Sequence, residues 1–302
     1  MKTAVSMLGT AARATRSLGA ILIDGGQLTP EDAERILLYQ KEHNLRFGEA
    51  AMRLGLISEA DIQYALSRQF AYAYLRTKPG EPRPLSDELV AAYQPFSSRV
   101  EQLRAIRSQL MLRWFDRSEE RQVLTIVGAE RGEGRSYLAA NLAIVFSQLG
   151  ERTLLVDADL REPRQHFLFH LENQVGFSTL LAGRSREEGI VRIPDLAGLS
   201  VLPAGPTPPN PLELLNRLNF DEFMIQAKGA YDVVIVDTPA LSSGEDAAMI
   251  AVRTGAALAV ARSGSTRVAD FSNLVQGLMD AGVAVVGSVL NQVPVKKVKK
   301  LK

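Results

Sequence analysis

The nine residues "GAERGEGRS", Gly128–Ser136, decide how the rest of the sequence is interpreted. They follow the apolar run "QVLTIVG" and open the segment "SYLAANLAIVFSQLG", a pattern typical of a buried strand that leads through a glycine-rich turn into a helix. Against the phosphate-loop pattern A/G-x-x-x-x-G-K-S/T, the stretch matches at Ala129, Gly134 and Ser136 and has Arg135 in place of lysine. The sequence therefore predicts a phosphate-binding loop.

The residue types in this loop suit a nucleotide phosphate. Gly132 and Gly134 let backbone N–H groups converge on phosphate oxygens, and the positive end of the following helix adds to the attraction. Ser136 offers a hydroxyl group to Mg²⁺. Arg135 keeps the charge of the usual lysine, but its planar guanidinium group is bulkier than an ammonium group. The predicted nucleotide-binding residues in this loop are Arg131, Gly132, Glu133, Gly134, Arg135, Ser136 and Tyr137.

Acidic residues stand at the ends of two later strand-like runs. The run "LLVDADLR" contains Asp157, Asp159 and Arg161, and the run "VVIVDTPA" contains Asp237. Because the carboxyl ends of parallel strands line the ligand crevice of an open α/β sheet, these carboxylates are predicted to hold Mg²⁺ or to accept a proton. One carboxylate at a strand end is also explained as a helix cap, but three of them after a phosphate loop favour a catalytic site.

Short apolar runs alternate with helical segments through the last two thirds of the chain. Runs that are nearly all apolar indicate strands buried on both faces, and their alternation with helices predicts a doubly wound, mostly parallel α/β sheet. The runs are "VLTIVG", "RTLLVD", "LSVLPA", "YDVVIVD", "GAALAVA" and "VAVVGSVLN".

Composition restricts the class of protein further. The chain has 302 residues, is 46% hydrophobic and carries a net charge of +1, so it can form substantial cores and has no charge excess favouring nucleic acid. The absence of cysteine excludes disulfides and thiolate metal sites, which fits a reducing cytoplasm. The sequence contains neither a signal-peptide pattern nor a run of about 18 apolar residues, so we expect no membrane span.

The N-terminal part contains an internal repeat with an offset of 29 positions. The stretch "SLGAILIDGGQLTPEDAERILLYQ" from Ser17 aligns with "RFGEAAMRLGLISEADIQYALSRQ" from Arg46. Each copy predicts a helix, a turn and a second helix, so the repeat is expected to form a small all-α domain. The predicted parts of the chain are a loose arm at 1–15, the helical module at 16–75, a linker rich in proline and charge at 76–96, the α/β domain at 97–293 and a basic tail at 294–302.

This repeat resembles the N-terminal module of the type II secretion and pilus-assembly ATPases, some of which bind cyclic di-GMP. Arg46 stands where that family has a ligand-contacting arginine, whereas the first copy has Ser17 there, with Arg16 adjacent. The resemblance therefore implies Arg16 and Arg46 as possible cyclic di-GMP contacts. The alternative is that leucines and glycines at these spacings only build a helical core that docks onto another protein.

The α/β part resembles the bacterial tyrosine kinases of exopolysaccharide and capsule synthesis, which share the P-loop fold of the MinD and ParA ATPases. The phosphate loop, "LLVDADLR" and "VVIVDTP" occur throughout that class. Two narrower stretches point to the kinases. They are "EQLRAIR", with Glu101, Arg104 and Arg107, and the proline-rich "LPAGPTPPNPLELL" at 202–215.

The resemblance implies an ATP- and Mg²⁺-dependent enzyme that phosphorylates tyrosine. In the implied mechanism Asp157 orients or deprotonates the acceptor hydroxyl, Arg135 and the loop backbone hold the β- and γ-phosphates, and Arg161 neutralises the phosphoryl charge that develops. Asn291 is expected to contact adenine, although an asparagine after a strand is equally well explained as a turn residue. The implied magnesium ligands are Ser136, Asp159 and Asp237.

Partners are implied as well. In relatives, the helix carrying Glu101, Arg104 and Arg107 mediates ring-like self-association, whereas by spacing alone these residues indicate an exposed helix with i,i+3 charge pairs. Together with the N-terminal repeat, the kinase domain looks most like the EpsG-type cytoplasmic autokinases, which act beside a separate membrane-embedded chain-length protein. We therefore expect a cytoplasmic protein recruited to the inner face of the membrane by that partner.

The sequence departs from the kinase pattern at three places. Arg135 replaces lysine, Ala240 replaces the second proline of D-T-P-P, and the C-terminal tyrosine cluster is missing, since the last tyrosine is Tyr231. The tail "VKKVKKLK" is interpreted as a solvated basic segment, with weak attraction to anionic membranes as an alternative. Tyr72 and Tyr74 are the candidate acceptors within the chain.

Two other functions fit parts of the sequence. A MinD-like switch that hydrolyses ATP to assemble and disassemble is favoured by the tyrosine-free tail and opposed by "EQLRAIR" and "PPNPLELL". A non-catalytic adaptor is favoured by Arg135 and opposed by the retention of all three aspartates. Phosphotyrosine formation and ATP binding distinguish the three hypotheses.

Overall fold

The computed structural model describes residues 16–69, 74–75, 82–115, 121–185, 187–194 and 196–292. The chain divides into two compact units, Met1–Ala73 and Tyr74–Lys302, each of which is described by itself. Among the described residues, no helix is long and apolar enough to cross a membrane.

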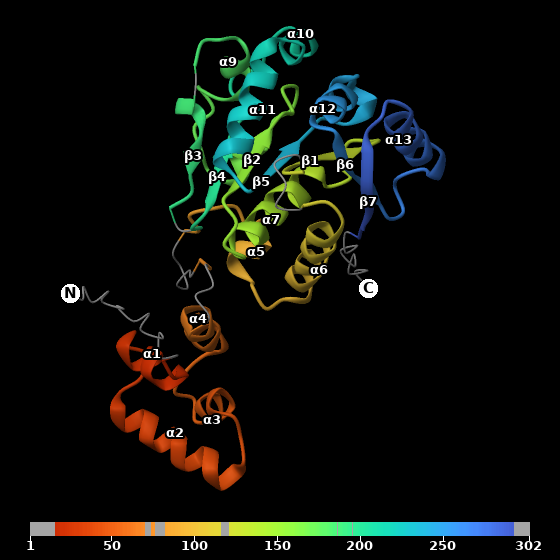
Figure 1. The fold of residues 1–302 in the computed structure, drawn as a ribbon. Coiled ribbons are helices and arrows are strands. Elements are labelled where there is room, and N and C mark those ends of the chain that lie inside the picture. Colours follow the sequence, from red (N-terminus) through yellow and green to blue (C-terminus); the bar gives the residue numbers. More distant parts are fainter. Residues whose placement is uncertain are drawn as a thin grey trace, which may run out of the picture. The chain divides into compact units, whose positions relative to one another are not determined.

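The first unit consists of two helix pairs that follow the sequence repeat (Figure 1). In both copies the first helix ends before a glycine with a left-handed backbone, Gly26 at φ +72° and Gly55 at φ +68°, a conformation that favours glycine. The second helix of each copy begins at a hydroxyl cap, because Thr29 and Ser58 accept hydrogen bonds from the backbone N–H groups of Asp32 and Asp61. The helices are α1 (Leu18–Asp24), α2 (Pro30–His43), α3 (Phe47–Arg53) and α4 (Glu59–Gln69).

The second unit is a seven-stranded sheet in the order β3-β4-β2-β5-β1-β6-β7. All neighbouring strands are parallel except β3 and β4. The strands are β1 (Val123–Gly128), β2 (Thr153–Asp157), β3 (Val191–Arg192), β4 (Leu199–Leu202), β5 (Val233–Asp237), β6 (Ala256–Arg262) and β7 (Ala284–Asn291). The sheet confirms the predicted doubly wound α/β fold.

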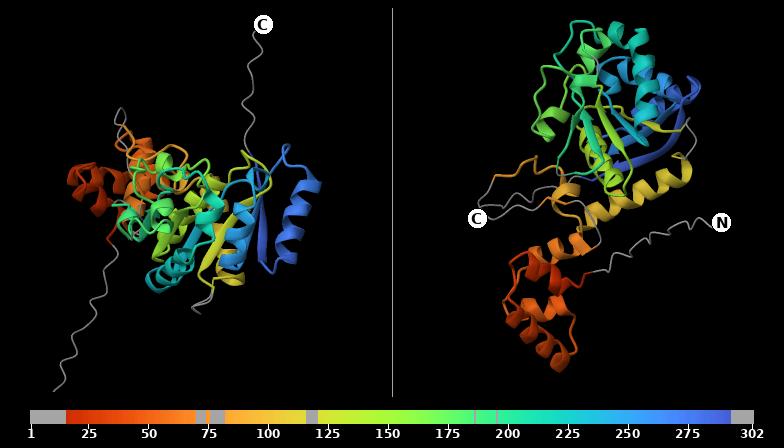
Figure 2. Two further views of the ribbon diagram at one scale, coloured as in Figure 1. Left: turned by 90° about the horizontal axis from the view of Figure 1, so that it is seen from above. Right: turned by 60° about the vertical axis from the view of Figure 1, so that its left-hand side comes forward.

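Helices cover both faces of this sheet (Figures 1 and 2). One face packs against α5 (Val90–Tyr93), α6 (Ser98–Arg113) and α7 (Arg135–Ser147). The other face carries α9 (Phe177–Leu181), α10 (Pro211–Leu215), α11 (Leu218–Ala230), α12 (Asp246–Thr254) and α13 (Val268–Asp280). The remaining helical elements of the second unit are α8 (Gln165–Leu168) and the 3₁₀ turns η1 (Glu187–Gly189) and η2 (Leu241–Ser243).

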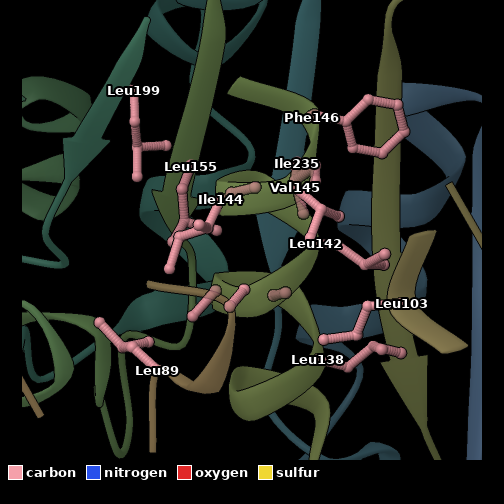
Figure 3. Close-up of a cluster of buried hydrophobic side chains, with 14 of the residues drawn as sticks. Leu89, Leu103, Leu138, Leu142, Ile144, Val145, Phe146, Leu155, Leu199 and Ile235 are labelled. Carbon is pink, nitrogen blue, oxygen red and sulfur yellow. The ribbon is translucent and has the colours of Figure 1, made fainter. Parts of the chain in front are cut away.

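Helix α7 is the central helix of the first face. Eleven of its residues are buried, and Figure 3 shows Leu138 beside Leu103 of α6 and Ile144 beside Leu155 of β2. Burying apolar side chains of this size stabilises a fold by about 1.5–3 kcal/mol each. The position of the first turn of α7, which carries the phosphate loop, is therefore fixed by the core.

The predicted linker at 76–96 is wrong for its described part, residues 82–96. Leu85 and Leu89 are buried, and the Tyr93 hydroxyl donates to the Leu85 carbonyl and accepts from the Leu85 N–H, both at 2.8 Å. Asn141 of α7 accepts a hydrogen bond from the Ala91 N–H at 3.0 Å. The prolines and charges before this stretch concealed a short apolar segment that belongs to the α/β core.

The boundary between the module and the next segment also lies earlier than predicted. The Leu75 N–H donates to the Ala92 carbonyl at 2.8 Å, and the Leu75 side chain joins the core under α5. Leu75, which the sequence places in the helical module, belongs instead to the second unit, in agreement with the division after Ala73.

Candidate nucleotide and magnesium site

The phosphate loop lies between the carboxyl end of β1 and the first turn of α7. Gly132 and Gly134 have φ +77° and +94°, left-handed conformations that L side chains rarely adopt. Helix α7 begins at Arg135, so the N–H groups of its first turn have no carbonyl acceptor within the helix. The loop thus has the backbone of an anion site at the positive end of a buried helix.

Tyr137 lies in the first turn of α7, but its ring packs partly buried against the core beside α5 and α6. Burial raises the pKa of its hydroxyl, the Glu88 charge raises it further, and the Arg99 charge opposes both. The backbone of Tyr137 therefore lies beside the loop in the first turn of α7, whereas its side chain is a packing group.

Arg135 is buried beneath the loop, with 8% of its side chain exposed. Its Nε donates to the Thr238 carbonyl at 3.2 Å and its Nη1 donates to the Glu130 carbonyl at 2.5 Å. The Glu133 carboxylate lies 3.6 Å from Nη1. The arginine is therefore anchored by the protein's own oxygens next to the place where a phosphate is predicted.

Three carboxylates gather opposite the loop. Asp157 and Asp237 are register partners at the ends of the adjacent strands β2 and β5, and both are fully buried. Asp159 lies two residues beyond the end of β2 and is 8% exposed. The predicted acidic cluster is thus formed by chain segments that are 80 residues apart in sequence but adjacent in the sheet.

Burial dominates the electrostatics of this cluster. It raises the pKa of Asp157 well above the ordinary value, and the neighbouring Asp237 charge adds to that shift, whereas N–H groups of Gln165 and Arg164 oppose it. Burial also raises the pKa of Asp237, to about 6, against hydrogen bonds from Gln165 and Ser136. The pKa of Asp159 is raised by burial as well. In such surroundings a nearby cation stabilises the ionised carboxylates.

The donor set fits Mg²⁺. Asp237 Oδ1 is buried without a hydrogen-bond partner among the described residues, and carboxylate and hydroxyl oxygens are the ligands that this hard cation prefers. Ser136 lies within hydrogen-bonding reach of Asp237 and adds the hydroxyl group. Ser136, Asp159 and Asp237 together therefore provide the ligand types of a magnesium site.

Gln165 connects the parts of the site and was missed in the sequence. Its side-chain Nε2 donates to Asp237 Oδ2 at 2.7 Å and to the Ser136 carbonyl at 3.2 Å. Its backbone N–H donates to Asp157 Oδ2 at 2.8 Å. One fully buried residue, through its side chain and its backbone N–H, thus joins the phosphate loop to two carboxylates. It lies in the short helix α8, whose sequence carries no motif.

Arg161 lies beside the cluster but is held by a second residue that the sequence did not reveal. Its Nε donates to Asp246 Oδ2 at 2.9 Å, and its Nη2 donates to Asp246 Oδ1 at 3.3 Å. Asp246 is buried at the start of α12. The Arg161 N–H donates to Asp159 Oδ1 at 3.1 Å, which places the arginine next to a predicted metal ligand.

The remaining predicted site residues lie on the rim of the loop. Asn291 ends β7, and its Nδ2 donates to the Glu133 carbonyl at 3.0 Å, so the end of this edge strand contacts the phosphate loop directly. Arg131 forms an ion pair with Glu162, and both side chains are largely exposed.

The predicted self-association residues are separate from this site, on α6. Arg104 and Glu101 form an ion pair at 3.1 Å, with Glu101 largely exposed. Arg107 Nη1 donates to the Val145 carbonyl at 2.6 Å, so this guanidinium fastens α6 to α7. At least part of the motif therefore has a structural role within the chain.

The two arginines predicted to contact cyclic di-GMP are both in the first unit. Arg16 forms an exposed ion pair with Asp24 at 2.9 Å. Arg46 is the N-terminal cap residue of α3, and its backbone N–H donates to Glu49 Oε2 at 3.2 Å.

Sequence comparisons match the second unit to known proteins. The family model described as "Cellulose biosynthesis protein BcsQ" matches residues 121–269. Tyrosine-protein kinase YwqD of Bacillus subtilis is 37% identical over 203 residues, which cover 67% of this chain and 85% of YwqD. Tyrosine-protein kinase etk of Escherichia coli K12 is 36% identical over 204 residues, which cover 68% of this chain but only 28% of etk.

Structural comparisons agree with that match. The kinase domain of Escherichia coli tyrosine kinase ETK superposes with a TM-score of 0.67 at 34% identity and covers 75% of this chain and 88% of the ETK domain. The septum site-determining protein MinD of Pyrococcus horikoshii, at 23% identity and a TM-score of 0.50, shares the fold over 56% of this chain and 70% of MinD. These findings confirm the P-loop fold and the resemblance in the α/β part. The chain belongs to the family of bacterial tyrosine-protein kinases.

Proposed function

We propose that this chain is a cytoplasmic, ATP- and Mg²⁺-dependent protein-tyrosine kinase that regulates the assembly or export of an extracellular polysaccharide. The observation that supports this proposal most strongly is the arrangement of Asp157, Asp159 and Asp237 opposite the phosphate loop, with Asp157 and Asp237 joined to the loop through Gln165. Three buried carboxylates facing an anion site suit a metal-bound nucleoside triphosphate.

In the proposed site the backbone of 131–136 binds the β- and γ-phosphates, and Arg135 adds positive charge beside them. Ser136, Asp159 and Asp237 hold Mg²⁺, which neutralises charge on the phosphate oxygens. Asn291, whose Nδ2 donates to the Glu133 carbonyl, is proposed to contact adenine.

Asp157 is proposed as the group that orients the acceptor tyrosine and takes its proton at a carboxylate oxygen. Its raised pKa makes it a stronger base than an exposed aspartate. Arg161, fixed by Asp246, is proposed to face the charge that develops on the transferred phosphoryl group.

The role of Asp157 is tested by Asp157→Asn, with Asp280→Asn at the exposed end of α13 as the matched control. We expect phosphotransfer to fall at least about a hundredfold in the first variant and to stay near wild type in the second. Calorimetry should find ATP affinity within about tenfold of wild type in both, since Asp157 is not assigned to the metal. Unchanged phosphotransfer by Asp157→Asn rules out the role.

The proposed partners are further copies of this chain and a membrane-embedded chain-length protein that recruits the kinase to the inner face of the membrane. Glu101 and Arg104 on α6 support the first proposal, because their side chains form a charged pair on the helix surface. Replacing Glu101 by lysine is expected to reduce oligomer size in sedimentation, whereas Lys228→Glu on α11 is the charge-changing control. Equal oligomer size in all three proteins contradicts the assignment.

For the helical module we propose binding of cyclic di-GMP through Arg46, with Arg16 as a second contact. The two repeat copies with matched glycine turns support this proposal. Arg46→Ala should lose calorimetric binding of cyclic di-GMP, whereas Arg53→Ala, on the exposed surface of α3, should retain it. No binding by the wild type contradicts the proposal and leaves a protein-docking module.

A further inference from the structure

The phosphate loop contains a carboxylate that the proposed mechanism does not use. Glu133 lies between the two left-handed glycines of the loop, and only 1% of its side chain is exposed. A negative charge buried in a phosphate-binding loop opposes the binding of phosphate, so its presence there indicates another role. We propose that the Glu133 carboxylate is an internal counter-ion of Arg135 that competes with nucleotide phosphate for the loop; the inference rests on the nucleotide binding proposed above.

The two carboxylate oxygens of Glu133 have different surroundings. Oε1 accepts a hydrogen bond from Thr266 Oγ1 at 2.5 Å, which fixes the side chain from the segment between β6 and α13. Oε2 is buried and has no hydrogen-bond partner among the described residues, and it lies 3.6 Å from Arg135 Nη1. Oε2 therefore acts on Arg135 through its charge.

Gly128 makes room for this pair. A Cβ atom at position 128 would lie 2.4 Å from Glu133 Oε2 and 3.0 Å from Arg135 Nη1, so no other residue fits there while the pair is in place. The glycine that ends β1 is thus explained by the buried charge pair, because its own backbone is not left-handed.

Arg135 does not depend on Glu133 for its orientation. The Thr238 and Glu130 carbonyls already hold Nε and Nη1, as described above. Nη2 has no hydrogen-bond partner among the described residues and remains as a donor for an anion. Replacing Glu133 by glutamine therefore removes a charge and preserves the hydrogen bond from Thr266 and the anchored arginine.

Two opposite effects follow from this geometry. In the nucleotide-free protein the Glu133 charge compensates the buried guanidinium and stabilises the loop. When phosphate binds, the Glu133 charge repels it and offsets part of the attraction between Arg135 and the phosphate. Glu133 thus lowers nucleotide affinity and stabilises the empty loop, in both cases through its charge.

The test compares Glu133→Gln with Glu130→Gln by calorimetric titration of ADP into the full chain without Mg²⁺. Both variants lose one negative charge from the same loop, but the Glu130 side chain is exposed. We expect Glu133→Gln to bind ADP at least about tenfold more tightly than Glu130→Gln, a difference of about 1.4 kcal/mol. Glu133→Val removes the same charge and replaces the glutamine variant if that does not fold.

A second readout separates this role from a merely structural one. Without nucleotide, Glu133→Gln should unfold at a lower Tm than wild type, and saturating ADP should raise its Tm by more than it raises that of wild type. Equal or weaker ADP binding by both Glu133 variants than by Glu130→Gln overturns the inference while leaving the proposed function intact. No ADP binding by the wild-type chain overturns the proposed nucleotide site itself.

Discussion

Single residues in this site gain their properties from distant neighbours in the sheet. Asp157 and Asp237 are buried side by side because parallel strands β2 and β5 end at the same level. Burial of the resulting carboxylate pair raises both pKa values. Functional residues of this kind are expected to reduce the stability of the empty site.

The raised pKa of Asp237 predicts that replacing this residue by asparagine stabilises the metal-free protein. The folded-state pKa of Asp237, about 6, lies above the ordinary value of 3.8. Between these two pH values the folded state therefore binds a proton that the unfolded state has lost. The stability of the metal-free protein is therefore reduced as pH rises through 6, by about 3 kcal/mol at most, since one pKa unit equals about 1.4 kcal/mol. Asp237→Asn removes this penalty.

In EDTA, urea unfolding at pH 8 should show Asp237→Asn to be more stable than wild type, and the difference should vanish near pH 4. Asp280→Asn, on the exposed end of α13, should leave the unfolding free energy nearly unchanged at both pH values. A destabilised Asp237→Asn at pH 8 would contradict the electrostatic account of the cluster.

A second prediction for a single residue concerns Gln165. Gln165→Leu leaves Asp237 Oδ2 and the Ser136 carbonyl without their side-chain donor, which is expected to cost about 1–3 kcal/mol for each buried group left unpaired. Because the same bonds fix the loop against the carboxylates, kcat should fall more than KM rises. Gln276→Leu removes only a surface hydrogen bond to Asp280 and is the control. Equal kinetics of the two variants would show that Gln165 is not a positioning residue.

Among the elements, those with a regular pattern were predictable and those defined by a few distant contacts were not. The buried strands β1, β2 and β5 have the all-apolar sequence of central parallel strands, so their runs alone indicated them. Strand β3 has two exposed residues and no detectable pattern. The carboxylates were predictable because they end strands, whereas Gln165 and Asp246 lie on short or later helices and reach the site through contacts with residues 72 and 85 positions away.

Helix α5 is also held by contacts with residues distant in sequence, which a local sequence pattern does not reveal. Asn141 holds its segment by accepting from the Ala91 N–H and donating to the Glu88 carbonyl, both at 3.0 Å. Asn141→Ala should destabilise the protein by about 2–4 kcal/mol, since buried backbone groups lose their partners. Hydrogen exchange at residues 88–91 should accelerate. Asn219→Ala, which removes one long bond of 3.4 Å to Leu180, should cost much less.

At the scale of the whole molecule, the division after Ala73 predicts which truncations fold. Removing residues 1–73 should leave a cooperatively unfolding kinase unit with a Tm within a few degrees of the full chain. Removing residues 1–96 exposes the face of α7 that Leu85, Leu89 and Tyr93 cover. Because burying one such side chain contributes about 1.5–3 kcal/mol, the free energy of unfolding should fall by several kcal/mol. Equal melting of the two fragments would contradict the revised boundary.

Tyrosine kinase activity is tested most directly by measuring transfer of labelled γ-phosphate from ATP to tyrosine by the purified chain, alone and with the cytoplasmic segments of a membrane chain-length protein. A kinase should place acid-stable label on tyrosine in at least one of the two mixtures, and this label should be absent when Mg²⁺ is removed. ATP that is bound and hydrolysed with no label on tyrosine in either mixture contradicts a kinase and indicates an ATP-driven assembly switch on the same fold.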